Sequence, residues 1–374
     1  MKKSVKIVIA PDSFKGSISA ADAAASIAAG LRAGIGKNAE TELLCLPIAD
    51  GGEGTLDALV PPADRITVRV TGTGGTPVAA EYGHIGGTAV IEMARAAGLT
   101  LVPEEKRSAM TATTRGVGEL ILDALDRGYR DFLLTVGGSG TNDGGCGMIS
   151  ALGVRFYDAA GQVFLPTGGT LQQIASIDTS AMDERLCACR FTIATDVKNP
   201  LLGAEGATLV YARQKGATEA ELAAMEQGMI HYASLLETCC GKPVATVPGC
   251  GAGGGLSAPL LGLLHAELRS GIDAVLDAVD FDSGLVGADA VITGEGKIDR
   301  QSLFGKAISG VCRAAAAQGV PVYAMVGCIG DDKQLLLDMG LKDIFAIGDL
   351  APDAAYSMAH ADELLERVAA ALTL

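Results

Sequence analysis

Apolar runs and amphipathic stretches alternate at both ends of the chain. A run of apolar residues at 3–11 (KSVKIVIAP) predicts a buried strand, and apolar residues recur at helical spacing after Ser19. Ser19 followed by Asp22 three residues later is typical of a helix N-terminus. The full pattern predicts strands at residues 3–11, 41–49, 288–296, 320–327 and 343–348. Strands of this kind joined by helices indicate a parallel sheet.

The middle of the chain has a different pattern. Between residues 61 and 89, short alternating segments rich in glycine are typical of antiparallel hairpins. Farther on, the sequence predicts helices at 116–127, 219–237 and 256–268, and strands at 131–138, 191–196 and 242–247. We therefore predict an α/β fold in which a flavodoxin-like parallel-sheet domain (1–60 and 285–374) is interrupted by a large inserted second α/β domain (61–284). The expected strand order of the first domain is 2-1-3-4-5.

Composition and charge narrow the range of partners. The 374 residues are 49% hydrophobic but only 4% aromatic and include 50 glycines, which suits an α/β enzyme with many tight loops. A net charge of −15 argues against nucleic acid and anionic membranes, because both attract clustered lysine and arginine. The longest uncharged stretch, 243–266, contains six glycines and three prolines and does not predict a membrane span. No signal peptide is recognisable, so the protein is expected in the cytoplasm, and a homo-oligomer is compatible with the sequence.

Three polar stretches with glycine follow the first three strands of the predicted flavodoxin-like sheet. They are APDSFKG (10–16), ADGGEG (49–54) and TGEGKID (293–299). In the order 2-1-3-4-5 these loops meet at the switch point between strands 1 and 3, where doubly wound sheets bind ligands. Lysines there can hold a phosphate or a carboxylate, and carboxylates can orient a hydroxyl group or bind a metal. The candidates are Ser13, Lys15, Asp50, Glu53, Thr293, Glu295, Asp299 and Lys306.

The predicted inserted domain contains two further glycine-rich stretches. TVGGSGTNDGGCGM (135–148) follows a predicted strand, and its small residues allow several N–H groups to converge on an anion. PGCGAGGG (248–255) is a second candidate of the same kind. The candidates from these stretches are Gly137, Gly138, Ser139, Asn142, Asp143, Gly251, Gly253 and Gly254, and a further candidate is Asp196 at the end of the predicted strand 191–196.

Two different functions are compatible with these glycine-rich loops. Gly249, Gly251 and Gly254 match the GxGxxG spacing of dinucleotide-binding loops, which would indicate an NAD-dependent oxidoreductase. That match is weak, because Pro248 interrupts the approach from the short predicted strand. A non-catalytic protein that binds small anions would use the same loops. P-loop, protein-kinase, serine-hydrolase and zincin motifs are absent, so glycine-rich loops, lysines and carboxylates favour another kind of phosphoryl transfer.

Eight segments together resemble the bacterial glycerate kinase family. They occur in order over nearly the whole chain and are KIVIAPDSFKGSISA, PIADGGEGT, GVGELILDAL, GGSGTNDGGCGM, DVKNPLLGAEGA, QKGAT, GAGGGL and ITGEGKIDRQSLFGKA. Gly140 stands where the family more often has alanine, and Arg213 where it tends to have proline. The resemblance implies ATP-dependent phosphorylation of D-glycerate with Mg²⁺, and 2-phosphoglycerate is the expected product. It also implies a cleft between a flavodoxin-like domain and a large inserted domain.

Each candidate residue then receives a hypothetical role in this reaction. Asp50 or Glu295 would orient the acceptor hydroxyl and take its proton, while Lys15 and Lys306 would stabilise the transferred charge or hold the glycerate carboxylate. Asp196 or Asp143 would hold Mg²⁺. The ATP phosphates would be received by Gly137, Gly138, Ser139, Asn142, Gly251, Gly253 and Gly254. The substrate site would be lined by Ser13, Glu53, Thr293 and Asp299.

Overall fold

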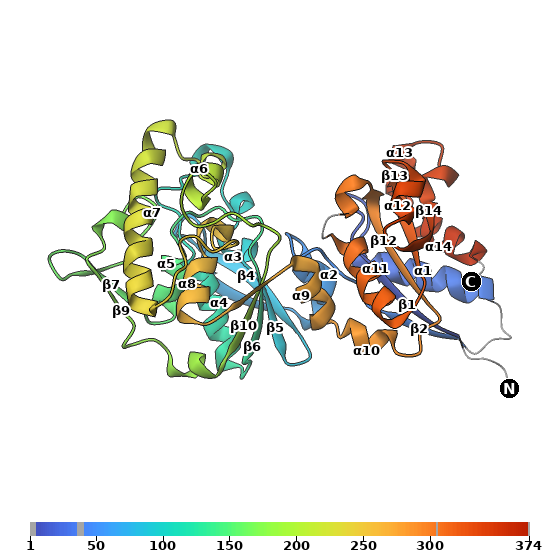
Figure 1. The fold of residues 1–374 in the computed structure, drawn as a ribbon, viewed down its shortest axis with the longest axis horizontal. Coiled ribbons are helices and arrows are strands. Elements are labelled where there is room, and N and C mark those ends of the chain that lie inside the picture. The colour runs from blue at the N-terminus through green and yellow to red at the C-terminus, as the bar shows by residue number, and fades with distance from the viewer. Residues whose placement is uncertain (1–4, 36–40, 304–305, 373–374) are drawn as a thin grey trace. The chain divides into compact units, whose positions relative to one another are not determined.

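The computed structural model describes residues 5–35, 41–303 and 306–372 (Figure 1). By its contacts the chain divides into two compact units. Unit 1 comprises Met1–Asp50, Asp57–Pro61 and Gly271–Leu374, and unit 2 comprises Gly51–Leu56 and Pro62–Ser270. Residues 271–284, which the sequence analysis assigned to the inserted domain, therefore belong with unit 1.

Unit 1 is built on a five-stranded parallel sheet in the order β14-β13-β12-β1-β2. Numbered along the chain within this unit, that order is 2-1-3-4-5, as predicted. Its strands are β1 (Val5–Pro11), β2 (Thr41–Cys45), β12 (Ala290–Ile298), β13 (Val322–Ile329) and β14 (Leu341–Ala346). Pro11 of β1 pairs with Gly294 of β12. Because strand order reverses between β1 and β12, the carboxyl ends of these two strands form the switch point.

Helices connect the strands of unit 1. They are α1 (Ala20–Ile35), α2 (Thr55–Leu59), α9 (Gly271–Ala278), α10 (Phe281–Leu285), α11 (Ala307–Gln318), α12 (Lys333–Leu337), α13 (Ala354–Ala359) and α14 (Ala361–Ala371). α1 begins as predicted, since the Ser19 hydroxyl accepts a hydrogen bond from the Asp22 N–H at 3.1 Å. A Cβ on Gly30 of α1 would lie 2.1 Å from Glu366 O of α14, so glycine is needed for these helices to pack. Ile27 of α1 and Ile7 of β1 belong to the same buried core.

Two predicted boundaries in unit 1 were wrong. β2 ends at Cys45 instead of residue 49, although the N–H groups of Leu46 and Ile48 still donate to Ile9 O and Pro11 O at 2.8 and 3.0 Å. β12 continues to Ile298, two residues past the predicted end, so Lys297 and Ile298 of the predicted loop 293–299 also pair with β13. Hydrogen bonds to a neighbouring strand decide both boundaries, and the apolar pattern does not reveal them.

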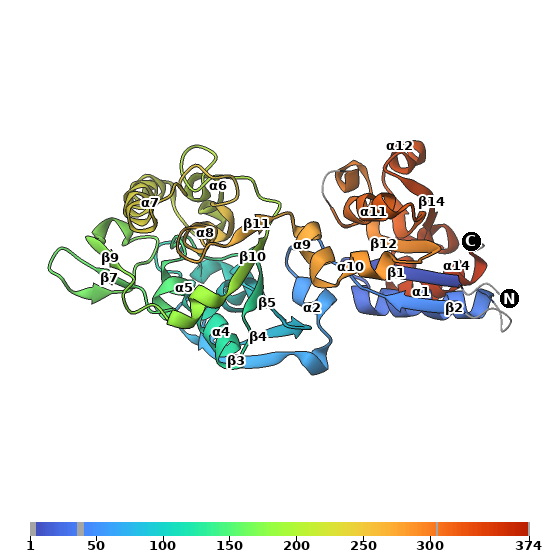
Figure 2. The same ribbon diagram turned by 60° about the horizontal axis from the view of Figure 1, so that its bottom comes forward.

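Unit 2 contains a six-stranded sheet in the order β11-β10-β6-β5-β4-β3 (Figure 2). Its strands are β3 (Ile66–Thr71), β4 (Pro77–Ile85), β5 (Thr88–Glu92), β6 (Asp131–Thr135), β10 (Arg190–Ala194) and β11 (Glu267–Arg269). β3, β4 and β5 pair antiparallel, as the hairpin pattern predicted, whereas β5, β6, β10 and β11 pair parallel. β3 and β5 thus run in the same direction, and the loops after β3, β5, β6 and β10 leave one edge of the sheet.

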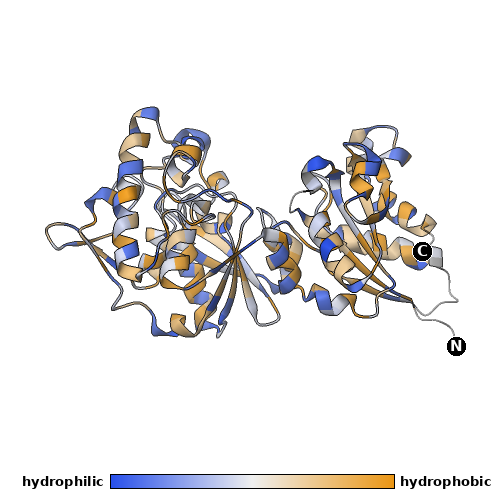
Figure 3. Ribbon diagram, viewed as in Figure 1, coloured by the Kyte–Doolittle hydropathy of each residue, from blue (hydrophilic) through white to orange (hydrophobic). Residues whose placement is uncertain are grey.

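The helices of unit 2 are α3 (Ala94–Ala97), α4 (Arg115–Asp126), α5 (Cys146–Ala151), α6 (Ala207–Tyr211), α7 (Glu219–Cys240) and α8 (Ser257–Leu263). α7 contacts α6 and α8 (Figures 1 and 2) and carries both hydrophobic and hydrophilic residues (Figure 3). Its buried Met229 and Tyr232 join the core of unit 2. In the part of the chain that the structure describes, no helix is long and apolar enough to cross a membrane.

Three predictions for unit 2 were wrong. Residues 242–247 form no strand, because the N–H groups of Val244 and Ala245 donate to the Glu237 carboxylate at 2.8 and 2.9 Å. The helix expected at 256–268 ends at Leu263, since His265 has a φ of 54° and the chain continues as β11. The sequence predicts a long glycine-rich loop between the strands expected at 131–138 and 191–196, but part of this region forms a small antiparallel sheet of β7 (Arg155–Tyr157), β8 (Val163–Phe164) and β9 (Ser176–Asp178).

Candidate active site

Three carboxylates gather at the switch point of the unit 1 sheet. We call Asp12, Asp50 and Glu295 the acidic cluster. Asp12 directly follows β1, and its N–H donates to Gly294 O of β12 at 2.8 Å, one residue before Glu295. Repulsion from Asp50 and Glu295 contributes to raising the pKa of Asp12, so the three carboxylates lie within electrostatic reach of one another. The residues of the three predicted loops are therefore brought together at this edge.

Two carboxyl groups of the acidic cluster, Asp12 and Glu295, have raised pKa values. Burial raises the pKa of Asp12 to about 7; the charges of Asp50 and Glu295 add to this shift, and the Ser13 N–H, 2.6 Å from Oδ1, opposes it. Burial also raises the pKa of Glu295, which the Ser302 hydroxyl at 2.6 Å opposes together with the charge of Lys306. A carboxyl group that titrates near neutral pH can accept a proton from a substrate hydroxyl. Asp12 lies inside a predicted loop but received no role in the sequence analysis, because its burial cannot be read from the sequence.

The remaining candidates of unit 1 have different surroundings. Thr293 is fully buried in β12, and its hydroxyl donates to Ala10 O at 2.8 Å, which links two strands. Asp299 forms an ion pair with Lys297 at 3.3 Å. Lys306 is half-buried just before α11. The two candidates of the first loop, Ser13 and Lys15, are exposed.

The first half of the glycine-rich loop in unit 2, residues 137–140, lies at the carboxyl edge of the sheet after β6. The Leu99 N–H donates to Gly138 O at 2.9 Å, and the Gly140 N–H donates to Ala97 O at 2.8 Å. Within the described residues, the N–H groups of Gly137, Gly138 and Ser139 donate to no protein acceptor. Glu53 also lies here, since a Cβ on Gly138 would be 3.0 Å from Glu53 Oε2. This half of the loop can offer successive amides to an anion.

The second half of this loop is buried and serves the fold. Asn142 and Asp143 have no exposed surface. The Asp143 carboxylate accepts four hydrogen bonds: two from the N–H and hydroxyl of Thr114, at 2.8 and 2.9 Å, and two from Gly145 and Gly147 N–H groups, at 3.0 and 3.2 Å. These bonds join the start of α4 to the start of α5. A metal at Asp143 would have to displace them, so Asp143 does not fit the Mg²⁺ ligand that the sequence analysis expected.

The glycines at 251–254 are packed against the backbone of unit 2. A Cβ on Gly251 would lie 2.3 Å from Pro200 O, and one on Gly254 would lie 2.0 Å from Thr141 O. Gly253 is likewise buried. Close packing accounts for these glycines without a ligand. Since residues 242–247 form no strand, the turn also lacks the strand that precedes the glycines of a dinucleotide-binding loop.

Asp196 is the other residue expected to bind a metal. It lies exposed in the loop after β10. Across the described parts of the chain, no three His, Cys, Asp or Glu side chains group so that they could hold a metal ion. Mg²⁺ keeps several waters and is commonly bound by one or two carboxylates together with substrate phosphates. An exposed single carboxylate such as Asp196 fits that mode, whereas the saturated Asp143 does not.

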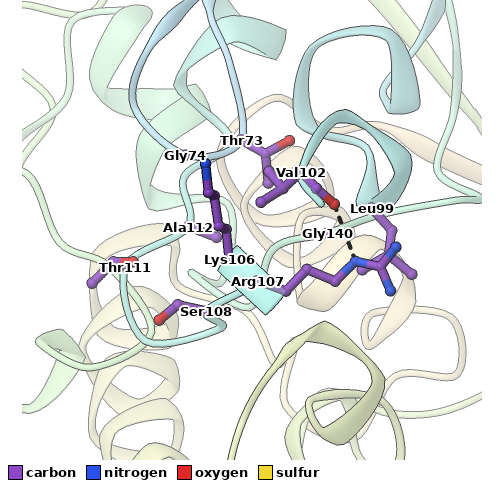
Figure 4. Close-up of a pocket in the computed structure, with 10 residues that line it drawn as sticks. All are labelled: Thr73, Gly74, Leu99, Val102, Lys106, Arg107, Ser108, Thr111, Ala112 and Gly140. Atoms are coloured by element: carbon purple, nitrogen blue, oxygen red, sulfur yellow. Dashed lines mark hydrogen bonds between the residues drawn. The ribbon is translucent and has the colours of Figure 1, made fainter. Parts of the chain in front are cut away.

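A pocket that the sequence analysis missed is lined in part by Gly140 of the same loop (Figure 4). It contains about 270 Å³ of empty space, part of it open to solvent. Lys106 and Arg107 make its lining positive, and Ser108 and Thr111 contribute hydroxyl groups. The Arg107 Nε donates to Val102 O at 3.3 Å, and this hydrogen bond restricts the orientation of the guanidinium. The full lining is Thr73, Gly74, Leu99, Val102, Lys106, Arg107, Ser108, Thr111, Ala112 and Gly140. Two cations and two hydroxyl groups beside a glycine-rich loop suit an anionic ligand.

Comparisons with known proteins agree along the whole chain. A sequence profile described as the Glycerate kinase family matches residues 7–374. The glycerate kinase of Bacillus subtilis strain 168 is 46% identical over 369 residues, covering 98% of this chain and 96% of that protein. The glycerate 2-kinase of Escherichia coli K12 is 42% identical over 347 residues, covering 92% and 90%. A crystal structure of a candidate glycerate kinase 2 from Salmonella typhimurium LT2 superimposes with a TM-score of 0.88 at 40% identity, covering 98% of this chain and 97% of that one. The chain therefore belongs to the glycerate kinase family.

Proposed function

We propose that this protein transfers the terminal phosphoryl group of ATP to the 2-hydroxyl of D-glycerate and releases 2-phosphoglycerate and ADP. The observation that carries the proposal is the full-length similarity to glycerate kinases, which include a glycerate 2-kinase. The acidic cluster of unit 1 and the glycine-rich loop with its cationic pocket in unit 2 supply groups that such a reaction needs.

The acidic cluster provides the acceptor side of the reaction. Asp12, with a pKa raised to about 7 mainly by burial, accepts the proton of the glycerate hydroxyl as the phosphoryl group arrives. Glu295, held by the Ser302 hydroxyl, and Asp50 orient that hydroxyl. Lys306 is close enough to lower the pKa of Glu295 and is placed to hold the glycerate carboxylate; the exposed Lys15 is a second candidate for that contact.

The donor side rests on unit 2. The amides of Gly137, Gly138 and Ser139 bind phosphate oxygens of ATP, and Lys106 and Arg107 of the neighbouring pocket neutralise charge on the same polyphosphate. Phosphoryl transfer depends mainly on positioning and charge neutralisation, and these amides and cations supply both. Mg²⁺ bound with ATP would add charge neutralisation at the phosphate oxygens, and Asp196 is the carboxylate suited to hold it.

An assay that reads both products tests the proposal. Purified protein is incubated with D-glycerate and MgATP, ADP release is followed by a coupled enzyme reaction, and ³¹P NMR identifies the position of the phosphate on the product. We expect ADP release that depends on glycerate, and a 2-phosphoglycerate resonance. A 3-phosphoglycerate resonance would correct the acceptor position, and the absence of glycerate-dependent ADP release would overturn the proposed function.

A further inference from the structure

A lysine is buried directly beneath the glycine-rich loop. Lys215 is 2% exposed, and its ammonium donates to Ser139 Oγ and to Thr141 O, both at 2.8 Å. The next residue, Gly216, has a φ of 93°, and a Cβ there would lie 2.2 Å from Arg107 O. The backbone next to Lys215 therefore packs closely against Arg107, which lines the cationic pocket.

The charge of Lys215 is poorly compensated by the protein. Among the residues that the structure describes, no carboxylate lies within ion-pair distance of its ammonium. Burial lowers the pKa of Lys215 to about 7, and the charge of Asp143 opposes that shift. Asp143 already accepts four hydrogen bonds from other groups. Ser139 and Thr141 carry no titratable group, and the neighbouring Arg107 meets this turn through its backbone oxygen.

The hydrogen bond from Lys215 fixes what Ser139 can offer to a ligand. An ammonium can only donate, so Ser139 Oγ accepts this bond and its own hydrogen is left to donate elsewhere. Ser139 is half-buried, and no acceptor for its hydroxyl is found in the described part of the chain. Ser139 thus has two donors available to a ligand, its hydroxyl hydrogen and its N–H, and the N–H groups of Gly137 and Gly138 add two more. The buried Lys215 ammonium is bonded to the same serine.

We infer that Lys215 is a positioning residue of the nucleotide site, which turns the Ser139 hydroxyl into a donor to a phosphate oxygen of ATP and supplies the buried positive charge that the phosphate pairs with. The inference rests on the proposed function, since it names the ligand as ATP. It adds Lys215 to the nucleotide site and gives it a role. The bound phosphate compensates the positive charge of Lys215, and Lys215 takes up a proton when the phosphate binds.

Proton uptake by Lys215 makes the affinity for ATP depend on pH, which a purely structural role of this lysine would not do. Free protein at pH 6 has Lys215 charged, whereas above pH 7 binding must also add a proton, so affinity falls as pH rises. The phosphates of ATP titrate near pH 6 as well, but they do so equally for every variant. The ratio of the Kd of a variant to that of the wild type therefore isolates the contribution of Lys215.

The test measures the Kd for MgATP between pH 6 and 9 by titration calorimetry on the full-length protein. We expect Lys215→Met to raise the Kd about 10- to 100-fold at pH 6, with the ratio to the wild-type Kd shrinking above pH 7. Lys215→Arg, whose charge does not titrate here, should recover part of the affinity at pH 6, and its Kd should lack the rise above pH 7 that proton uptake gives the wild type. Lys242→Met is the matched control: Lys242 is a half-buried lysine of unit 2 whose ammonium lies 2.9 Å from His265 Nδ1, and its loss should leave Kd unchanged.

Ser139→Ala keeps the test decisive if Lys215→Met fails to fold. We expect it to weaken MgATP binding about tenfold while the KM for glycerate stays at the wild-type value. Wild-type affinity in both Lys215→Met and Ser139→Ala, or a Kd ratio independent of pH, would overturn the inference and leave the proposed function intact. A wild-type protein that binds no ATP would instead overturn the proposed function.

Discussion

Asp12 is the residue on which the proposed chemistry depends most directly. It lies beside two other carboxylates at the switch point, and burial together with their charges raises its pKa to about 7. A general base must be deprotonated to act, so kcat/KM of the wild type should fall as pH decreases below about 7. We expect Asp12→Asn to lower kcat about 10²- to 10⁴-fold with little change in ATP affinity or thermal stability. Steady-state kinetics between pH 5.5 and 9, with thermal unfolding of both proteins, checks this.

Asp50→Asn separates the two carboxylates that could take the proton. If Asp12 is the base, removing the Asp50 charge lowers the pKa of Asp12, and the acidic limb of the rate profile moves to lower pH. If Asp50 is itself the base, kcat falls at every pH and the limb does not move. A variant of Asp12 with wild-type kcat would exclude Asp12 and return the role to Asp50 or Glu295.

At the scale of elements, Asp143 joins the start of α4 to the start of α5. Asp143→Asn replaces a charged acceptor of four hydrogen bonds with an amide that presents a donor to some of the same groups. We expect a loss of about 2–4 kcal/mol in the free energy of unfolding, measured by urea denaturation. The Mg²⁺ concentration for half-maximal rate should not change in the folded protein.

Asp196→Asn is the matched control for that experiment. Asp196 is exposed, so the same change of chemistry should lower the free energy of unfolding much less than Asp143→Asn does. If Asp196 holds Mg²⁺, the half-maximal Mg²⁺ concentration rises instead. The opposite pattern, with Asp143→Asn shifting the Mg²⁺ requirement and leaving stability unchanged, would restore Asp143 as the metal ligand.

The turn before α8 offers a second comparison between paired variants. Gly254 and Gly241 have nearly the same φ, 70° and 71°. A Cβ would lie 2.0 Å from Thr141 O at Gly254, but would meet nothing within 4 Å at Gly241. Gly241→Ala should cost about 1 kcal/mol for backbone strain, and Gly254→Ala about 1–3 kcal/mol more for the collision. Chemical denaturation measures both, and equal losses would mean that packing does not explain Gly254.

Elements with a strong local signal were predictable from the sequence. The apolar run of β1 and the Ser19–Asp22 start of α1 each specify their element locally. Alternation of strands and helices predicted the parallel sheet of unit 1, and its strand order was expected because five such strands are typical of a flavodoxin-like sheet. Residues 242–247 have the composition of a strand, but the Glu237 side chain, several residues earlier in α7, takes the N–H groups that a strand would pair. Contacts of this kind between side chain and backbone leave no periodic signal.

The sequence predicted which loops form the candidate site more reliably than it predicted the roles of individual residues. Glycines and carboxylates after strands marked the correct loops, because ligands bind at strand ends in such sheets. The roles of individual residues depend on burial: Thr293 and Asp143 are used within the fold, while Asp12 and Lys215 gain shifted pKa values from their surroundings. A lysine in a sequence such as RQKGAT is ordinarily expected at the surface, so only the structure reveals it beneath a loop.

For the whole molecule, the net charge and the two units set the conditions for binding. A net charge of −15 repels ATP, so its affinity must come from local groups such as Lys106, Arg107 and Lys215. All three belong to unit 2, as does the glycine-rich loop. Unit 2 also has a buried core of its own. These facts predict that nucleotide binding can be separated from phosphoryl transfer by dividing the chain.

A fragment of residues 51–270 tests this division. It should start at residue 51, because Glu92 is 1% exposed and its carboxylate accepts hydrogen bonds from the N–H groups of Gly54 and Leu56, both at 3.1 Å. We expect it to unfold cooperatively and to bind MgATP with a Kd within a few-fold of the intact protein, but to phosphorylate no glycerate, since it lacks Asp12 and Glu295.

The shorter fragment 62–270 leaves Glu92 without those donors and should be less stable by about 3 kcal/mol or more. Urea denaturation and calorimetric titration of both fragments measure these outcomes; a folded 51–270 fragment that does not bind ATP would show that unit 2 alone does not form the nucleotide site.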